Sequence, residues 1–87
     1  MPTPSQKELV RIVYDILRTQ LLSVGSEFTP RSNLVEAGLD SLAVTQLLLA
    51  IEEQTGIWVD EGLLTPETLE SAETLAACVH ELQRKIA

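Results

Sequence analysis

The sequence predicts an all-α fold: a four-helix bundle with three longer helices, a short third helix and a long first loop. Three observations lead to this prediction. Apolar residues recur at helical spacing in three stretches, a helix-start signal precedes each expected helix, and turn-forming residues crowd the segment between the first two. The 87 residues, 45% of them hydrophobic, suffice for one core, so we expect a single domain over residues 1–87.

The first helix is expected to begin after Ser5, because Ser5 and Glu8 have the spacing of a capping box. It should reach about Thr19 or slightly beyond, and Gly25 ends any helical pattern. One face of this helix carries apolar residues at i, i+3, i+4 and i+7: Leu9, Ile12, Val13 and Ile16.

A long loop is expected over residues 24–39, which are rich in glycine, serine, proline and asparagine. Loops of this length in a compact domain are usually pinned or functional, and the expected pins are Phe28, Leu34 and Leu39. Asn33 and Glu36 have the spacing to cap one short helical turn within it.

The second helix is expected to run from Ser41 to about Thr55, with Asp40 as its N-cap and Gly56 as the residue that ends it. Two faces follow from a rotation of 100° per residue. The face expected to be buried against the first helix carries Val44, Leu47, Leu48 and Ile51. The face expected to point outward carries Leu42, Gln46, Leu49 and Glu53.

The rest of the chain should hold an extended connection over 57–59, a turn over 60–62 and two helices. Thr65 followed by Pro66 predicts a short third helix through about Glu70. Ser71 should cap a fourth helix that runs nearly to the C-terminus. The apolar residues of that helix repeat at i, i+4, i+7 and i+11: Leu75, Val79, Leu82 and Ile86.

The chain is acidic, with a formal net charge of −7 and a pI of about 4.4. All six basic residues lie outside residues 32–83, and ten acidic residues lie inside that span. Nucleic acid and anionic membranes are therefore not expected as partners, whereas basic protein surfaces are.

A single cysteine, Cys78, excludes an internal disulfide, and with the single histidine, His80, it cannot form a zinc site, so no metal is expected. Neither an export signal nor a membrane-length apolar run is present, and we expect a cytoplasmic protein.

The stretch Gly38-Leu39-Asp40-Ser41-Leu42 places a hydroxyl in the first turn of the second helix. Free backbone N–H groups and the positive end of the helix dipole converge there. A phosphate ester on Ser41 would be electrostatically favoured.

A small acidic helical chain with this stretch opening its second helix resembles the acyl and peptidyl carrier proteins over essentially its whole length. The resemblance implies that Ser41 is the attachment point for 4′-phosphopantetheine, whose thiol holds an acyl or aminoacyl group as a thioester. It also implies a carrier that is not an enzyme. The implied partners are a phosphopantetheinyl transferase, an acyl or aminoacyl ligase (an adenylation enzyme) and a downstream acyltransferase or synthase.

Partner enzymes are expected to contact the outward side of the second helix, where apolar and acidic residues adjoin the Ser41 end: Asp40, Leu42, Gln46, Leu49, Glu52 and Glu53. On resemblance and apolar content, the cargo is expected to lie between the second and third helices near Leu42, Val59, Leu63 and Leu64. Carriers of ordinary fatty acid synthesis usually have acidic residues soon after the serine, whereas this chain has Ala43 and Gln46. This difference favours a discrete carrier of a specialised pathway of the polyketide or nonribosomal peptide type. A monomer is expected because a carrier shuttles between enzymes.

Two other functions are consistent with parts of the sequence. An acidic helical adaptor would bind partner proteins without a prosthetic group, and modification of Ser41 distinguishes it from a carrier. A hydrolase would need Ser41 and His80 to meet, which nothing in the sequence indicates. Cys78 and His80 point about 200° apart on one helix, so they cannot form a local nucleophile and base pair, and Cys78 is expected in the core. Trp58 fits either a half-buried loop aromatic or a partner contact.

Overall fold

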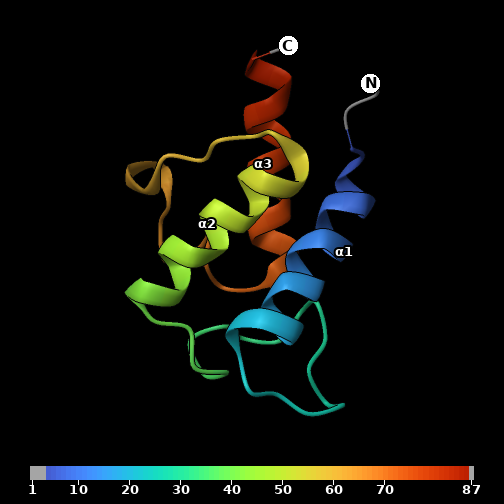
Figure 1. Ribbon diagram of the computed structural model, residues 1–87, viewed down its shortest axis with the longest axis vertical. Helices are drawn as coiled ribbons and strands as arrows, with labels where there is room; N and C mark the ends of the chain where they lie inside the picture. The colour runs from blue at the N-terminus through green and yellow to red at the C-terminus, as the bar shows by residue number, and fades with distance from the viewer. Residues whose placement is uncertain (1–3, 87) are drawn as a thin grey trace.

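The computed structural model describes residues 4–86, and in this range it contains helices and turns without any strand (Figure 1). The helices are α1 (Gln6–Ile16), α2 (Ser41–Thr55) and α3 (Ala72–Ile86). A π-helical turn, η1 (Leu17–Leu21), extends α1, and a 3-10 turn, η2 (Glu61–Leu63), lies between α2 and α3. The start of α1 and the end of α3 lie at the same end of the molecule, where the Gln83 Nε2 donates to the Pro4 carbonyl at 2.7 Å. The three longer predicted helices are confirmed.

One hydrophobic core joins the three helices, and it contains the predicted faces except at Ile86, whose side chain lies outside the described part of the structure. Their fully or almost fully buried residues are Leu9, Val13, Ile16, Val44, Leu47, Leu48, Ile51, Leu75 and Val79. Ile12 and Leu82 are partly buried and pack against this core. None of the helices within residues 4–86 is long and apolar enough to span a bilayer.

The predicted caps are present at both ends of α2 and at the start of α1. Ser5 and Glu8 form the reciprocal capping box, with bonds of 3.2 and 3.3 Å. The Ala43 N–H donates to the Asp40 Oδ1 at 2.8 Å, which fixes where α2 begins. Gly56 ends α2 with φ of 75°, a left-handed conformation that glycine adopts without strain.

The loop between η1 and α2 is pinned by the three predicted residues, since Phe28, Leu34 and Leu39 are all buried. Hydrogen bonds also hold it to the rest of the molecule. The Tyr14 hydroxyl donates to the Phe28 carbonyl at 2.7 Å, and the two rings stack with centroids 5.3 Å apart. The Leu34 N–H donates to the Glu70 carbonyl at 2.9 Å, which ties the loop to the segment before α3.

The predicted short third helix is wrong, because residues 65–70 form a hydrogen-bonded turn that does not continue as a helix. The predicted Thr65 cap is present: the Thr68 N–H donates to the Thr65 Oγ1 at 3.2 Å. The turn stops because its carbonyls bond elsewhere. The Thr68 carbonyl accepts from the Thr74 hydroxyl at 2.8 Å, and the Glu70 carbonyl accepts from the loop.

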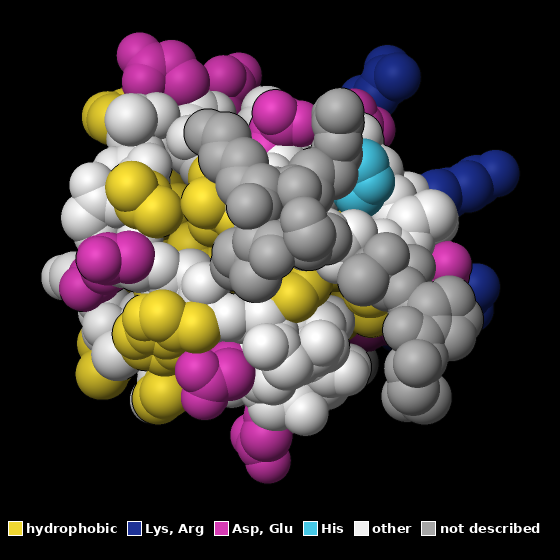
Figure 2. All heavy atoms as spheres, turned by 90° about the horizontal axis from the view of Figure 1, so that it is seen from above, with side chains coloured by type: hydrophobic (Ala, Val, Ile, Leu, Met, Phe, Trp, Pro, Cys, Tyr) yellow, Lys and Arg dark blue, Asp and Glu magenta, His cyan; other side chains and the backbone are white. Residues whose placement is uncertain are grey.

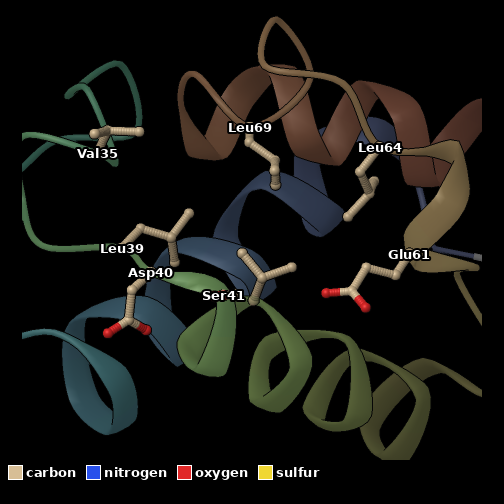
Figure 3. A pocket seen from close by; sticks show the side chains of 8 residues that line it. Val35, Leu39, Asp40, Ser41, Glu61, Leu64 and Leu69 are labelled. Atoms are coloured by element: carbon tan, nitrogen blue, oxygen red, sulfur yellow. The ribbon is translucent and has the colours of Figure 1, made fainter.

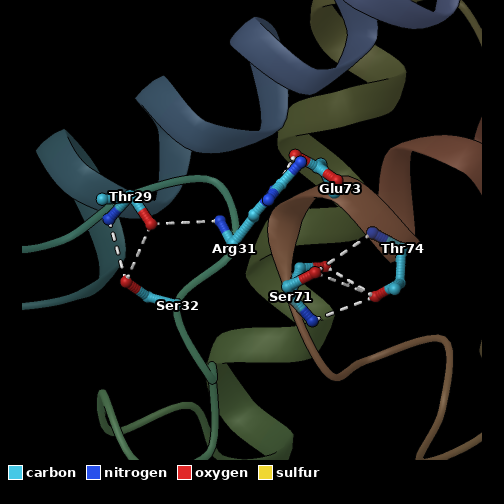
Figure 4. Close-up of polar contacts among 6 residues, drawn as sticks. All are labelled: Thr29, Arg31, Ser32, Ser71, Glu73 and Thr74. Carbon is cyan, nitrogen blue, oxygen red and sulfur yellow. Dashed lines mark hydrogen bonds and ion pairs between the residues drawn. The ribbon is translucent and has the colours of Figure 1, made fainter.

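The start of α3 is held by a compact cluster of hydrogen bonds centred on Thr74 (Figure 4). The Ser71 N–H donates to the Thr74 Oγ1 at 3.0 Å, and the Thr74 N–H donates to the Ser71 Oγ at 3.2 Å. Ser71 is thus the predicted N-cap, with threonine in the position that glutamate takes in an ordinary capping box. Beside it, the exposed Arg31 guanidinium contacts the Glu73 carboxylate at 3.2 Å, a pair too solvated to contribute much stability.

We predict that Thr74→Val lowers the free energy of unfolding by about 1–3 kcal/mol, because it leaves the Ser71 N–H and the Thr68 carbonyl without their partner while keeping the side-chain shape. Urea unfolding followed by circular dichroism measures this. Thr19→Val is the matched control, since the exposed Thr19 hydroxyl bonds only the Asp15 carbonyl one turn earlier. Equal stability of the two variants would contradict a structural role for the hydrogen bonds of Thr74.

Candidate functional site

Ser41 is the first residue of α2, and its side chain is exposed. The Ala43 and Val44 N–H groups are taken up by the side chain and the carbonyl of Asp40. Within the described part of the chain, the Ser41 and Leu42 N–H groups have no hydrogen-bond partner. The hydroxyl therefore lies beside two free donors at the positive end of a 15-residue helix, an arrangement that fits a phosphate ester.

A tight turn before α2 sets the direction in which Ser41 is presented. The Asn33 Oδ1 accepts from the Glu36 N–H at 2.9 Å, which confirms the predicted cap of a short helical turn. Gly38 closes the turn with φ of 108°, a conformation that side chains disfavour. The Leu39 N–H reaches back to the Leu34 carbonyl at 2.9 Å, and the Gly38 N–H to the Val35 carbonyl at 3.1 Å, the hydrogen bonds of a Schellman motif. Leu39 is thereby buried, and the next two residues remain exposed.

A hollow of about 370 Å³ opens beside Ser41 (Figure 3). It lies between the start of α2, the end of the first loop and the segment that leads from η2 to α3. Its lining is mainly aliphatic, with carboxylates at its edge: Val35, Leu39, Asp40, Ser41, Val44, Glu61, Leu64 and Leu69. The sequence did not single out Val35, Leu39, Val44 or Leu69 as facing this hollow, because their apolar character signals only core.

The residues expected to face cargo lie in different environments. Leu64 is half-buried and lines the hollow. Val59 is completely buried in the core, and Leu63 is 54% exposed on η2. Leu42 is 68% exposed. Of the four residues, only Leu64 lines the hollow.

The residues expected to meet partners are all exposed and all lie on or beside α2: Asp40, Leu42, Gln46, Leu49, Glu52 and Glu53. We call this set the α2 face. Ala43 is buried and does not belong to it. Viewed from above, the exposed hydrophobic side chains gather on one side of the molecule among acidic ones, and the basic side chains lie on the opposite side (Figure 2).

The residues that could suggest other chemistry do not gather around Ser41. His80 is half-buried on α3 and does not line the hollow. Cys78 is half-buried rather than a core residue. Trp58 is 54% exposed in the connection after α2, which fits a half-buried loop aromatic and leaves surface for a partner contact. Among residues 4–86 no group of three or more His, Cys, Asp or Glu side chains is arranged to hold a metal ion.

Comparison with known proteins gives concordant matches. A family model described as "Phosphopantetheine attachment site" matches residues 8–81. The chain is 30% identical over 77 residues to aminoacyl carrier protein 1 of Bradyrhizobium diazoefficiens, covering 88% of this chain and 83% of that protein. It is 33% identical over 82 residues to the chloroplastic acyl carrier protein 2 of Hordeum vulgare, covering 93% of this chain and 62% of that protein.

A chain in the crystal structure of the Bradyrhizobium japonicum glycine:[carrier protein] ligase complexed with glycylated carrier protein superposes with a TM-score of 0.59. The two are 28% identical, and the match covers 83% of this chain and 95% of the other. The family model spans most of this chain, including the exposed serine at the start of α2. The chain therefore belongs to the phosphopantetheine attachment family of acyl carrier proteins, which are carriers with a covalent 4′-phosphopantetheine and are not enzymes.

Proposed function

We propose that Ser41 carries the 4′-phosphopantetheine group and that the protein presents an acyl or aminoacyl thioester on it to biosynthetic enzymes. The observation that carries this proposal is the exposed Ser41 hydroxyl beside free N–H donors, inside the stretch that the family model matches. The arm's terminal thiol supplies the thioester chemistry, and its flexibility keeps the cargo at high effective concentration near successive active sites.

The residues of this chain present the hydroxyl rather than activate it. A serine hydroxyl is a weak nucleophile without a base, and no histidine lines the hollow beside Ser41. The proposed transferase supplies the base and the magnesium ion. As the serine oxygen bonds to the phosphorus of coenzyme A, its proton passes to that base and the nucleotide half of coenzyme A leaves. Asp40 fixes the start of α2, and the first-turn N–H groups face the phosphate ester so formed.

We further propose that the α2 face binds the transferase, a ligase that loads the cargo, and the downstream acyltransferase or synthase. Leu42 and Leu49 give this face 68% and 52% exposed apolar side chains, and Glu52 and Glu53 add charge. Small contacts of this composition suit partners that must exchange rapidly. A ligase partner is supported by the glycine:[carrier protein] ligase complex with which the chain shares its fold.

The pathway and the cellular setting belong to the same proposal. We place the protein as one carrier domain in the cytoplasm, a monomer that serves a specialised pathway of the polyketide or nonribosomal peptide type. The uncharged, exposed Gln46 on the α2 face supports this placement. The cargo is proposed to rest in the hollow beside Ser41, with Leu64 as the expected cargo residue that lines it.

We predict that incubation with coenzyme A, magnesium and a broad-specificity phosphopantetheinyl transferase adds one phosphopantetheine to the protein and none to Ser41→Ala. Intact-mass spectrometry measures the addition. Ser26→Ala is the control, because Ser26 is also exposed but lies in the first loop. If well-folded unmodified protein gains no mass, the carrier proposal fails and the acidic adaptor takes its place.

A second prediction concerns the α2 face. Glu53→Lys should lower kcat/KM of the transferase reaction about threefold to tenfold at low salt, and the loss should shrink as salt is added, because an exposed charge acts mainly on association. Glu27→Lys makes the same charge change in the first loop and should leave kcat/KM within twofold of the parent. Equal effects of the two variants would show that net charge, and not the α2 face, governs docking.

A further inference from the structure

The hollow beside Ser41 contains a carboxylate that the fold does not use. Glu61 lies on η2, and its side chain points from there toward the hollow (Figure 3). The hydrogen bonds that form η2 come from other groups: the Asp60 Oδ1 accepts from the Gly62 N–H at 2.8 Å, and the Asp60 carbonyl accepts from the Leu63 N–H. The Glu61 carboxylate itself has no hydrogen bond or ion pair among residues 4–86.

Neighbouring groups do not neutralise Glu61. No lysine, arginine or histidine lines the hollow, and every basic residue of the chain lies outside residues 32–83. The other carboxylate at the hollow, Asp40, is different, because its Oδ1 accepts from the Ala43 N–H. Glu61 is thus the carboxylate of this lining that is left without a partner in the described structure.

A ligand that suits this lining has an apolar part and a positive charge. Val35, Leu64 and Leu69 offer aliphatic contact, and Glu61 offers an acceptor with full negative charge. The Glu61 side chain is exposed, so water can solvate its charge; an acyl group with its own carboxylate would be repelled there, and a neutral acyl chain would gain no attraction from it. An aminoacyl thioester carries an α-ammonium group two bonds from the thioester carbonyl carbon, which satisfies both parts of the lining.

We propose that Glu61 is a specificity-determining residue that holds the α-ammonium group of an aminoacyl cargo in the hollow beside Ser41. This inference rests on the proposed function and narrows its cargo to amino acids. The flexible arm allows the cargo to fold back to the surface beside its own attachment point. Glu61 then forms a charge-assisted hydrogen bond with the ammonium group, while the aliphatic lining accepts the amino acid's carbon atoms.

The experiment compares two cargoes of the same shape. The glycyl group ends in an ammonium group where the propionyl group ends in a methyl group. Each is loaded as an amide-linked coenzyme A analogue by the broad-specificity transferase, so the cargo cannot hydrolyse during the measurement. The pKa of the glycyl amino group is read by NMR titration of ¹⁵N-labelled glycine, and backbone amide shifts report contact with the hollow.

The parent should hold the glycyl amino pKa about half a unit above its value in Glu61→Gln, because a nearby carboxylate favours the charged amine. Glu67→Gln makes the same charge change at an exposed position outside the lining and should match the parent. The glycyl cargo should shift the amides of Leu64 and Leu69 more than the propionyl cargo does, and Glu61→Gln should remove that difference.

The outcomes separate this inference from the function on which it rests. Failure of Ser41 to gain mass would overturn the carrier function itself. Normal loading with equal glycyl pKa values in the parent and Glu61→Gln would overturn the role of Glu61 alone. Shifts that Glu61→Gln changes equally for the glycyl and propionyl cargoes would also overturn it, because they would show contact with the arm's amides and not with the ammonium group.

Discussion

The anchoring of the first loop is the constraint on which the presentation of Ser41 depends. Nineteen residues, 22–40, separate η1 from α2, and a free segment of that length would let the start of α2 move. Instead, Leu34 is completely buried and its N–H bonds the Glu70 carbonyl. The same leucine accepts the Leu39 N–H that closes the turn at Gly38. One residue thus joins the loop, the approach to α3 and the entry into α2.

Two sources of charge meet at the start of α2 and have opposite signs. The helix dipole and the free N–H groups of the first turn favour a phosphate at Ser41. The carboxylates around it, Asp40 on one side and Glu61 across the hollow, disfavour further anions. The negative charge of Asp40 is partly compensated, because its carboxylate accepts the Ala43 N–H and caps the helix. The Glu61 carboxylate has no such hydrogen bond in the described structure, and the proposed contact with the cargo rests on this difference.

Local signals in the sequence predicted most of the fold because each depends on neighbouring residues. A capping box placed the start of α1, and Asp40 and Gly56 placed the two ends of α2. Helical spacing identified the buried faces of both helices. The predicted third helix failed for a nonlocal reason. Its turn begins as Thr65 and Pro66 indicate, yet the Thr68 and Glu70 carbonyls accept bonds from Thr74 and Leu34, and residue spacing alone does not reveal such partners.

The candidate site, like the fold, has a part that local sequence predicts and a part that depends on distant segments. The position of Ser41 follows from a short stretch of sequence, whereas the hollow is built by three segments that are distant along the chain. Val59 shows the difficulty: it stands among apolar residues expected near cargo, and it is completely buried in the core. Leu39 and Leu69 look like ordinary core residues; they do pack in or against the core, and they also line the hollow.

In the proposed function, the surface that partner enzymes bind differs from the surface that distinguishes one cargo from another. The α2 face is exposed, so on this proposal different enzymes can contact it without any change in the carrier. The hollow lies between the start of α2, the end of the first loop and the segment before α3, and it shares only Asp40 with the α2 face. On the proposed function, a substitution elsewhere in the hollow alters cargo binding and leaves docking unchanged. The Glu61 carbonyl helps to close η2 by accepting from the Leu64 N–H, but its carboxylate makes no described contact, so Glu61→Gln tests the proposed cargo contact without removing a bond of the fold.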